Sequence, residues 1–231
     1  RQDDEDMDKY GRDETENLHF NPEVVVFPAS SEEVAAVVSL CHRHGYPVTA
    51  RGAGTGLSGG ALPIYGGVVL SMEKMNKIIR IDEVNFQVTV QPGVITQVLQ
   101  ESVEKKGLFY PPDPASRGSC FIGGNLAENS GGPKAVKYGV TKDFVLDLEV
   151  VLSDGQLIRT GAAVLKNATG YNLTQLFVGS EGTLGIITEA VLSLIPKPRY
   201  DLLMLVPFTS AIEACRAVNE IFLAGFTPSG L

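Results

Sequence analysis

Three glycine-rich clusters, far apart in the chain, are the residues whose types and spacing could bind a ligand. The first is ARGAGTGLSGG, residues 50–60. Glycine adopts left-handed backbone conformations at little steric cost and lets another molecule lie directly against the main chain. Consecutive backbone N–H groups in such a turn suit an anion, and Arg51 at the mouth adds a charge that can pair with phosphate. The cluster predicts a pyrophosphate-binding loop, although a plain surface turn is also compatible with it.

The residues after this loop decide which kind of loop it is. Gly54–Gly59 matches the dinucleotide fingerprint G-x-G-x-x-G, but that fingerprint must open a helix. Residues 60–67 contain a proline and three glycines, and residues 68–72 have the pattern of a strand, so no helix fits. A P-loop would need a lysine after its glycines. We expect a strand-to-strand loop that binds its anion with main-chain amides, with a Rossmann-type NAD domain as a minor alternative.

The other two clusters are also built for close approach of a ligand. Residues 111–132 begin with three prolines in four positions, which stiffen the backbone, and continue with five glycines. Residues 179–185, GSEGTLG, are not a serine-hydrolase elbow, because the serine directly follows the first glycine. Each cluster alone could be a loop without a ligand. Together they suggest one extended ligand contacted along its length by backbone.

Composition excludes several functions. The 231-residue chain has a net charge of −8, and residues 1–16 hold eight acidic and three basic side chains. The remainder is only mildly acidic, which argues against a nucleic-acid-binding face. No apolar run approaches the ~18 residues of a membrane span. The three isolated cysteines suggest a reducing, cytoplasmic compartment. No metal-ligand spacing and no nucleophile with an evident base are present, so the sequence indicates a cofactor-binding protein.

Apolar periodicity and capping signals predict the elements that position the clusters. Residues 24–28, a helix capped by Ser30 and ended by Gly45, and residues 47–50 form one βαβ unit with a parallel pair of strands. An antiparallel sheet with flanking helices is predicted from strands at 68–72, 78–81, 88–90, 145–152, 157–159 and 186–195 and helices at 96–106 and 173–178. A last strand at 202–206 and helix at 210–224 cannot bury their own faces.

These elements predict three parts. Residues 1–19 are an acidic, turn-rich lead-in, poorly ordered at its very end. Residues 20–199 form the main domain, with subdomains at about 20–80 and 81–199. Residues 200–231 are the first strand and helix of an incomplete domain.

The motifs at residues 47–60, 112–132 and 179–188 together resemble the FAD-binding domain of the vanillyl-alcohol oxidase family, the PCMH-type flavoprotein fold. They are most similar to the group of glycolate oxidase flavoprotein subunits, D-lactate dehydrogenases and D-2-hydroxyglutarate dehydrogenases, and the similarity runs from about Val24 to Gly230. It implies an α+β fold: a small α/β subdomain, a larger subdomain with an antiparallel sheet and flanking helices, and the truncated start of an α/β cap domain.

The resemblance also implies which residues hold FAD. The first loop would hold the pyrophosphate, and the other two clusters would line the flavin, the ribityl chain and the rest of the cofactor. These residues are Arg51, Gly52, Ala53, Gly54, Thr55, Gly56, Leu57, Ser58 and Gly59; Pro112, Asp113, Pro114, Ser119, Cys120, Gly123, Gly124, Asn125, Ala127 and Asn129; and Glu181, Gly185 and Ile187. Some relatives attach the flavin through a histidine in the first loop. That neighbourhood holds Thr55 and no histidine, so we expect non-covalent FAD.

The implied activity is oxidation of a 2-hydroxy acid, such as glycolate or D-lactate, to the 2-oxo acid by hydride transfer to flavin N5. Catalytic and metal-binding residues are expected in the cap domain and not in this chain, which therefore need not turn over alone. Electrons would pass to an iron–sulfur subunit or a quinone, in the cytoplasm or at the periphery of the inner membrane, and a homo-oligomer is left open. The alternative is the same fold in an NADPH-dependent reduction of the peptidoglycan-reductase type.

Overall fold

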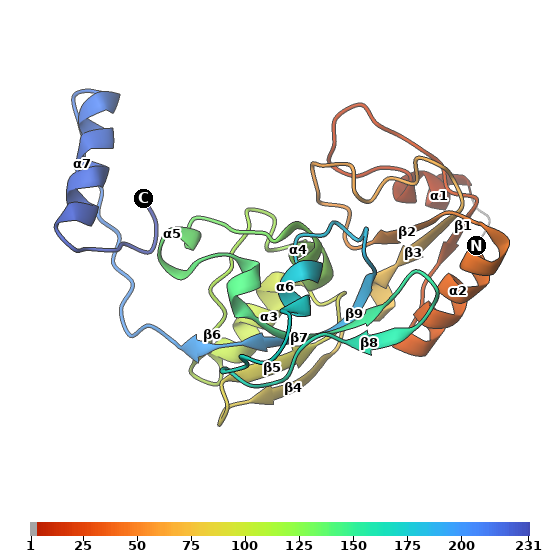
Figure 1. Cartoon of the computed structure of the whole chain (residues 1–231). Helices are drawn as coiled ribbons and strands as arrows, with labels where there is room; N and C mark the ends of the chain where they lie inside the picture. The colour runs from red at the N-terminus through yellow and green to blue at the C-terminus, as the bar shows by residue number, and fades with distance from the viewer. Residues whose placement is uncertain (1–3) are drawn as a thin grey trace.

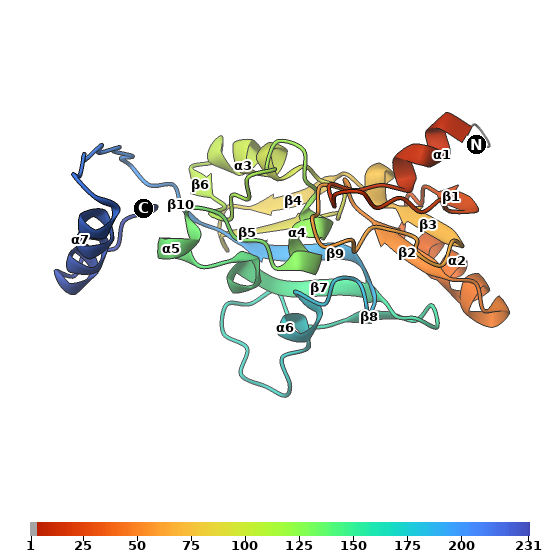
Figure 2. The same ribbon diagram turned by 90° about the horizontal axis from the view of Figure 1, so that it is seen from above.

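The computed structural model describes residues 4–231. Its two main sheets are a small parallel sheet and a larger antiparallel sheet (Figure 1). Figure 2 shows the small sheet, the large sheet and the C-terminal helix α7 arranged in a row. The α+β fold predicted from the sequence is confirmed. No helix within residues 4–231 combines the length and apolar character that a membrane crossing requires.

The small sheet is parallel and has the order β1-β3-β2, formed by Val24–Val26, Val68–Ser71 and Val48–Arg51. Helix α2, Ser31–His44, begins at the predicted N-cap Ser30 and ends at Gly45, which has the left-handed φ of 69°. The predicted direct pairing of β1 with β2 is wrong, because β3 lies between them. The strand at 68–72 was expected in the antiparallel sheet, and this prediction is also wrong, because β3 pairs in parallel with both β1 and β2. Its fully buried residues Val69 and Leu70 fit the central position of a sheet. The loop between β2 and β3 contains no helix, as predicted.

The large sheet is antiparallel and has the order β4-β5-β9-β7-β8. Its strands are Ile78–Asp82, Gln87–Val90, Ile186–Ser193, Val145–Val151 and Leu157–Arg159. The predicted hairpin of β7 and β8 is confirmed. A short pair, β6 (Leu108–Phe109) with β10 (Ile195–Pro196), lies beside this sheet.

Helices cover one face of the large sheet and enclose the main core (Figure 1). They are α3 (Thr96–Glu104), α4 (Ile122–Glu128) and α6 (Leu173–Phe177). Leu99 of α3 and Ile122 of α4 pack into the same fully buried cluster as Leu148 and Leu192 of the sheet. The sequence predicted α3 and α6 but not α4, whose glycines disfavour helix. Short helical turns complete the domain at Met72–Lys74, Ala135–Tyr138 and Thr141–Phe144.

Glu149 of β7 connects the small sheet's helix to the large sheet. Its Oε1 accepts hydrogen bonds from Ser31 Oγ at the start of α2 (2.5 Å) and from Thr188 Oγ1 of β9 (3.0 Å). Val151, two residues further along β7, packs into the core of the small sheet. These contacts fix the small sheet against the end of β9 that follows the third glycine-rich cluster.

The acidic lead-in packs on the body. Residues 1–3 lie outside the described part of the chain, so the expected order of the very end is not addressed. Asp4–Tyr10 form helix α1, so the predicted turns are wrong for these residues. Tyr10 is buried, its hydroxyl donates to Glu73 Oε1 (3.0 Å), and its ring packs edge-on against Phe27. One apolar ring thus anchors a segment whose composition suggested none.

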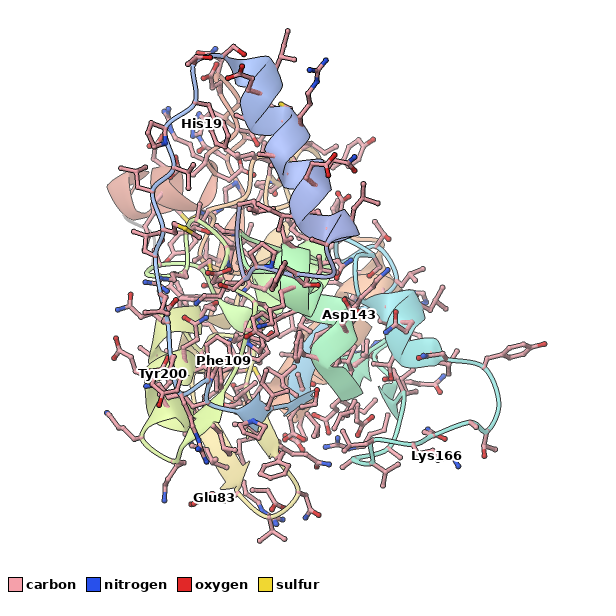
Figure 3. All side chains as sticks on the ribbon, turned by 90° about the vertical axis from the view of Figure 1, so that its left-hand side faces the viewer. His19, Glu83, Phe109, Asp143, Lys166 and Tyr200 are labelled. Atoms are coloured by element: carbon pink, nitrogen blue, oxygen red, sulfur yellow. The ribbon has the colours of Figure 1, made fainter. Side chains whose placement is uncertain are left out.

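Residues 200–231 stand apart from the core. Helix α7, Ala211–Leu223, is capped by Ser210, where the sequence predicted the start of a helix, and it lies away from the sheets (Figure 1). Residues 202–206 form no strand, which contradicts the prediction. A strand needs a partner, and Leu203 is fully exposed, with no strand beside it in the described chain. A second projection is the loop at residues 161–172, which carries Lys166 (Figure 3).

Candidate functional site

One cleft between the two sheets brings the three glycine-rich clusters together. The cleft is open to solvent, and its empty space counted out to that solvent is about 1060 Å³. The predicted residues that line it are Arg51, Gly52, Ala53, Gly54, Thr55 and Gly56 of the first cluster, Cys120, Gly123, Gly124, Asn125 and Ala127 of the second, and Glu181, Gly185 and Ile187 of the third. Three segments that lie far apart in the sequence therefore share one surface.

Other predicted residues do not line the cleft: Leu57, Ser58, Gly59, Pro112, Asp113, Pro114, Ser119 and Asn129. Some of them support it. Ser58 Oγ donates to Glu128 Oε1 (3.0 Å), and Glu128 is a lining residue. Asn129 Oδ1 accepts from the backbone N–H of Lys142 (2.9 Å), which fixes the end of α4. As contacts of FAD, these residues remain predictions.

Several lining residues were not predicted: Asp13, Met72, Pro92, Ser116, Phe121, Glu128, Ser130, Ser180, Gly182 and Ile186 among them. Phe121, Ser180 and Gly182 lie inside the clusters, so the cluster itself was the signal. Asp13 gave none, because it sits in an acidic run far from any glycine motif.

Glycines of all three clusters leave open space along the cleft. A Cβ built on Gly56, Gly124 or Gly182 would meet no other atom within 4 Å, and all three residues line the cleft. Gly182 has a φ of +74°, which disfavours any other residue. The open backbone is what close approach of an extended ligand such as FAD requires, so these residues fit that cofactor.

Arg51 lies beneath its loop. The residue is 5% exposed, and Nη2 donates to the backbone oxygen of Lys9 (3.1 Å). An added Cβ on Gly54 would lie 2.2 Å from that nitrogen. Burial lowers the pKa of the Arg51 guanidinium, and the charge of Asp13 acts in the opposite direction. The sequence suggested that Arg51 lies exposed at the mouth of the loop, and this prediction is wrong. Arg51 instead supplies a buried positive charge behind the loop. Its Nη1 has no hydrogen-bond partner among the side chains and backbone that the structure describes.

Helix α4 forms the wall opposite the first loop, and the third cluster is hydrogen-bonded to its C-terminal end. The backbone N–H groups of Gly179 and Glu181 donate to the carbonyls of Leu126 and Ala127, each at 2.9 Å. Glu181 has a left-handed φ of 54°, unusual for this residue type. These two bonds fix the third cluster to the C-terminal end of α4. In the described chain, no group of His, Cys, Asp and Glu is arranged to hold a metal ion.

Comparison with known proteins gives this geometry a family. The family model described as FAD binding domain matches residues 22–161. The glycolate oxidase subunit GlcD of Bacillus subtilis (strain 168) is 47% identical over 96% of this chain and 47% of its own length. A D-lactate dehydrogenase of Anaerostipes hadrus is 47% identical over 91% of this chain and 44% of its own length. The D-2-hydroxyglutarate dehydrogenase of Stutzerimonas stutzeri (strain A1501) is 43% identical over 83% of this chain and 41% of its own length.

The chain spans about half the length of the curated relatives it matches. Among solved structures, alkyldihydroxyacetonephosphate synthase superposes with a TM-score of 0.78 and 27% identity, over 92% of this chain and 39% of that one. The fold, the cleft and the sequence comparisons agree. The chain belongs to the FAD-binding domain family of PCMH-type flavoproteins, and its cofactor is FAD.

Proposed function

We propose that this chain is the FAD-binding part of an enzyme that oxidises a 2-hydroxy acid of the glycolate or D-lactate type to the 2-oxo acid. The observation that carries the proposal is the single cleft into which all three glycine-rich clusters open. The names of the relatives supply the substrate class: glycolate oxidase subunit, D-lactate dehydrogenase and D-2-hydroxyglutarate dehydrogenase.

The residues of this chain bind and orient the cofactor. FAD, when bound, supplies the redox chemistry by accepting at N5 the hydride that leaves the substrate. The loop after β2 would hold the pyrophosphate with main-chain amides, and the buried charge of Arg51 behind it would offset the phosphate charge. Helix α4 and the third cluster would support the remainder of the cofactor through backbone that lies open to the cleft. We further propose that FAD is held non-covalently, because the first loop holds Thr55 and no histidine to which a flavin could be attached.

We assign the residues that bind the substrate and take its hydroxyl proton to a cap domain that begins within residues 200–231. In support, α7 and the segment before it expose large apolar side chains, including Leu205 (93%) and Ile212 (67%). The cleft has no histidine among its described lining residues that could take the substrate's hydroxyl proton. The same proposal includes a cytoplasmic enzyme, in solution or peripheral to the inner membrane. It passes electrons to an iron–sulfur subunit or a quinone, and a homo-oligomer is compatible with it.

Two measurements test the proposal. Titration of the purified chain with FAD should quench flavin fluorescence and saturate at one FAD per chain. In the natural protein that contains this sequence, anaerobic addition of glycolate or D-lactate should bleach the flavin absorbance, and NADPH should not. Bleaching by NADPH alone would replace the activity with the peptidoglycan-reductase type. A chain that binds NAD but no FAD would overturn the cofactor assignment.

A further inference from the structure

Thr96, the first residue of α3, lies fully buried between two residues of the cleft. Its Oγ1 is 2.5 Å from Asn125 Nδ2 and 3.2 Å from Cys120 Sγ, and Asn125 and Cys120 both line the cleft. Thr96 itself does not line it. The hydroxyl therefore contacts two candidate cofactor residues from behind, without access to the cofactor.

The hydrogen bonds of this trio have one consistent direction. The Thr96 hydroxyl carries a single hydrogen. It also lies 3.4 Å from the carbonyl oxygen of Cys120, which can only accept. Because Thr96 Oγ1 accepts from Asn125 Nδ2, its own hydrogen is left for the Cys120 side. The amide nitrogen of Asn125 faces Thr96.

The orientation of Nδ2 also determines where Oδ1, the other polar atom of the Asn125 amide, lies. Asn125 is 2% exposed, and its Oδ1 accepts no hydrogen bond from the described residues. With Nδ2 directed to Thr96, the Oδ1 atom on the other side of the amide remains available to a ligand as an acceptor. FAD carries matching donors, namely the ribityl hydroxyls and the flavin N3–H. A rotated amide would present N–H groups to those donors and lose the match.

We propose that Thr96 is a positioning residue for FAD: its hydroxyl fixes the orientation of the Asn125 amide so that an acceptor faces the cofactor. The inference rests on the proposed binding of FAD in this cleft. It adds to the candidate FAD-binding residues one that lies outside the three glycine-rich clusters and does not line the cleft.

The test compares Thr96→Val, which removes the hydroxyl at nearly constant shape, with Thr96→Ser, which keeps it. We expect the dissociation constant of FAD to rise about tenfold in the valine variant and to stay within about twofold of wild type in the serine variant. Thr174→Val is the matched control. Thr174 is also buried and pairs with the Thr160 hydroxyl (2.8 Å), but neither residue lines the cleft. It should lower the melting temperature without changing FAD affinity.

A double-mutant cycle separates positioning from packing. In an Asn125→Ala background, Thr96→Val should cause no further loss of FAD affinity, because the amide it orients is gone. If the valine variant does not fold, Thr96→Ala takes its place in the cycle. An equal loss in both backgrounds, or an unchanged FAD affinity of folded Thr96→Val, overturns the inference while leaving the proposed function intact. Failure of the wild-type chain to bind FAD would instead remove the proposed function.

Discussion

The two long walls of the cleft use the same residue type, glycine, but are supported from behind in opposite ways. Behind Gly54 lies a buried cation, Arg51, with the carboxylate of Asp13 also lining the cleft. Behind the second wall lies a neutral set of hydrogen bonds that joins Asn125 to Thr96. We infer that the loop wall acts through charge, whereas the α4 wall acts through shape and hydrogen-bond direction. Substitutions on the loop wall should therefore change ligand affinity in a way that depends on salt and on the ligand's phosphates, whereas substitutions on the α4 wall should not.

The largest expected effect is on the α4 wall, from Gly124→Ala. Gly124 lies within helix α4, and its added Cβ would enter open cleft space. Replacing glycine by alanine in a helix interior should raise the free energy of unfolding by up to about 1 kcal/mol. The same methyl group should occupy the path of the cofactor and raise the FAD dissociation constant at least thirtyfold. Thermal unfolding of the chain without FAD measures the gain in stability, and titration with FAD measures the loss of affinity.

Gly230→Ala is the control for this substitution. Gly230 lies outside the cleft, and an added Cβ would make only an ordinary contact, 3.6 Å from the carbonyl oxygen of Pro133. It should change FAD affinity by less than twofold. A Gly124→Ala chain that is more stable and binds FAD as wild type does would place the cofactor away from α4.

The next effect is on the loop wall, from Arg51→Met, which keeps an unbranched aliphatic stem and removes the charged guanidinium. We expect the FAD dissociation constant to rise about tenfold at low salt, since one unit charge near a pyrophosphate contributes on the order of 1 to 4 kcal/mol at partly screened distances. The loss should shrink as salt increases, but less steeply than for an exposed charge, because Arg51 is buried. Riboflavin, which has no phosphate, should bind wild type and variant alike, whereas Gly124→Ala should weaken both ligands.

Arg51→Lys separates charge from geometry. It should recover part of the FAD affinity but lose the donation to the carbonyl of Lys9. An Arg51→Met chain whose FAD loss does not depend on salt would show that Arg51 supports the loop only by packing beneath Gly54.

The same contrast explains what the sequence could predict. Glycine density, the Ser30 and Gly45 caps and the alternating strands predicted the two sheets, the strand-to-strand loop and the shared cleft, because each is a local signal. The central place of β3, the burial of Arg51 and the bond from Thr96 to Asn125 depend on residues brought together only by folding. Residues 202–206 were predicted as a strand from composition alone, but composition cannot supply the partner that a strand needs.

The smallest expected effect has the opposite sign and comes from Asp13→Asn. Asp13 lines the cleft, and its Oδ2 is buried without a hydrogen-bond partner in the described chain. Its negative charge stabilises the Arg51 cation but repels the phosphates of FAD. Neutralising it should tighten FAD binding about two- to fivefold at low salt, because the Arg51 charge is then less compensated. Glu14→Gln makes the same charge change at an exposed neighbour outside the cleft and should change FAD affinity little. If Asp13→Asn weakens FAD binding instead, the carboxylate is needed to hold Arg51 in place, and the loop wall depends on the two opposite charges together and not on the cation alone.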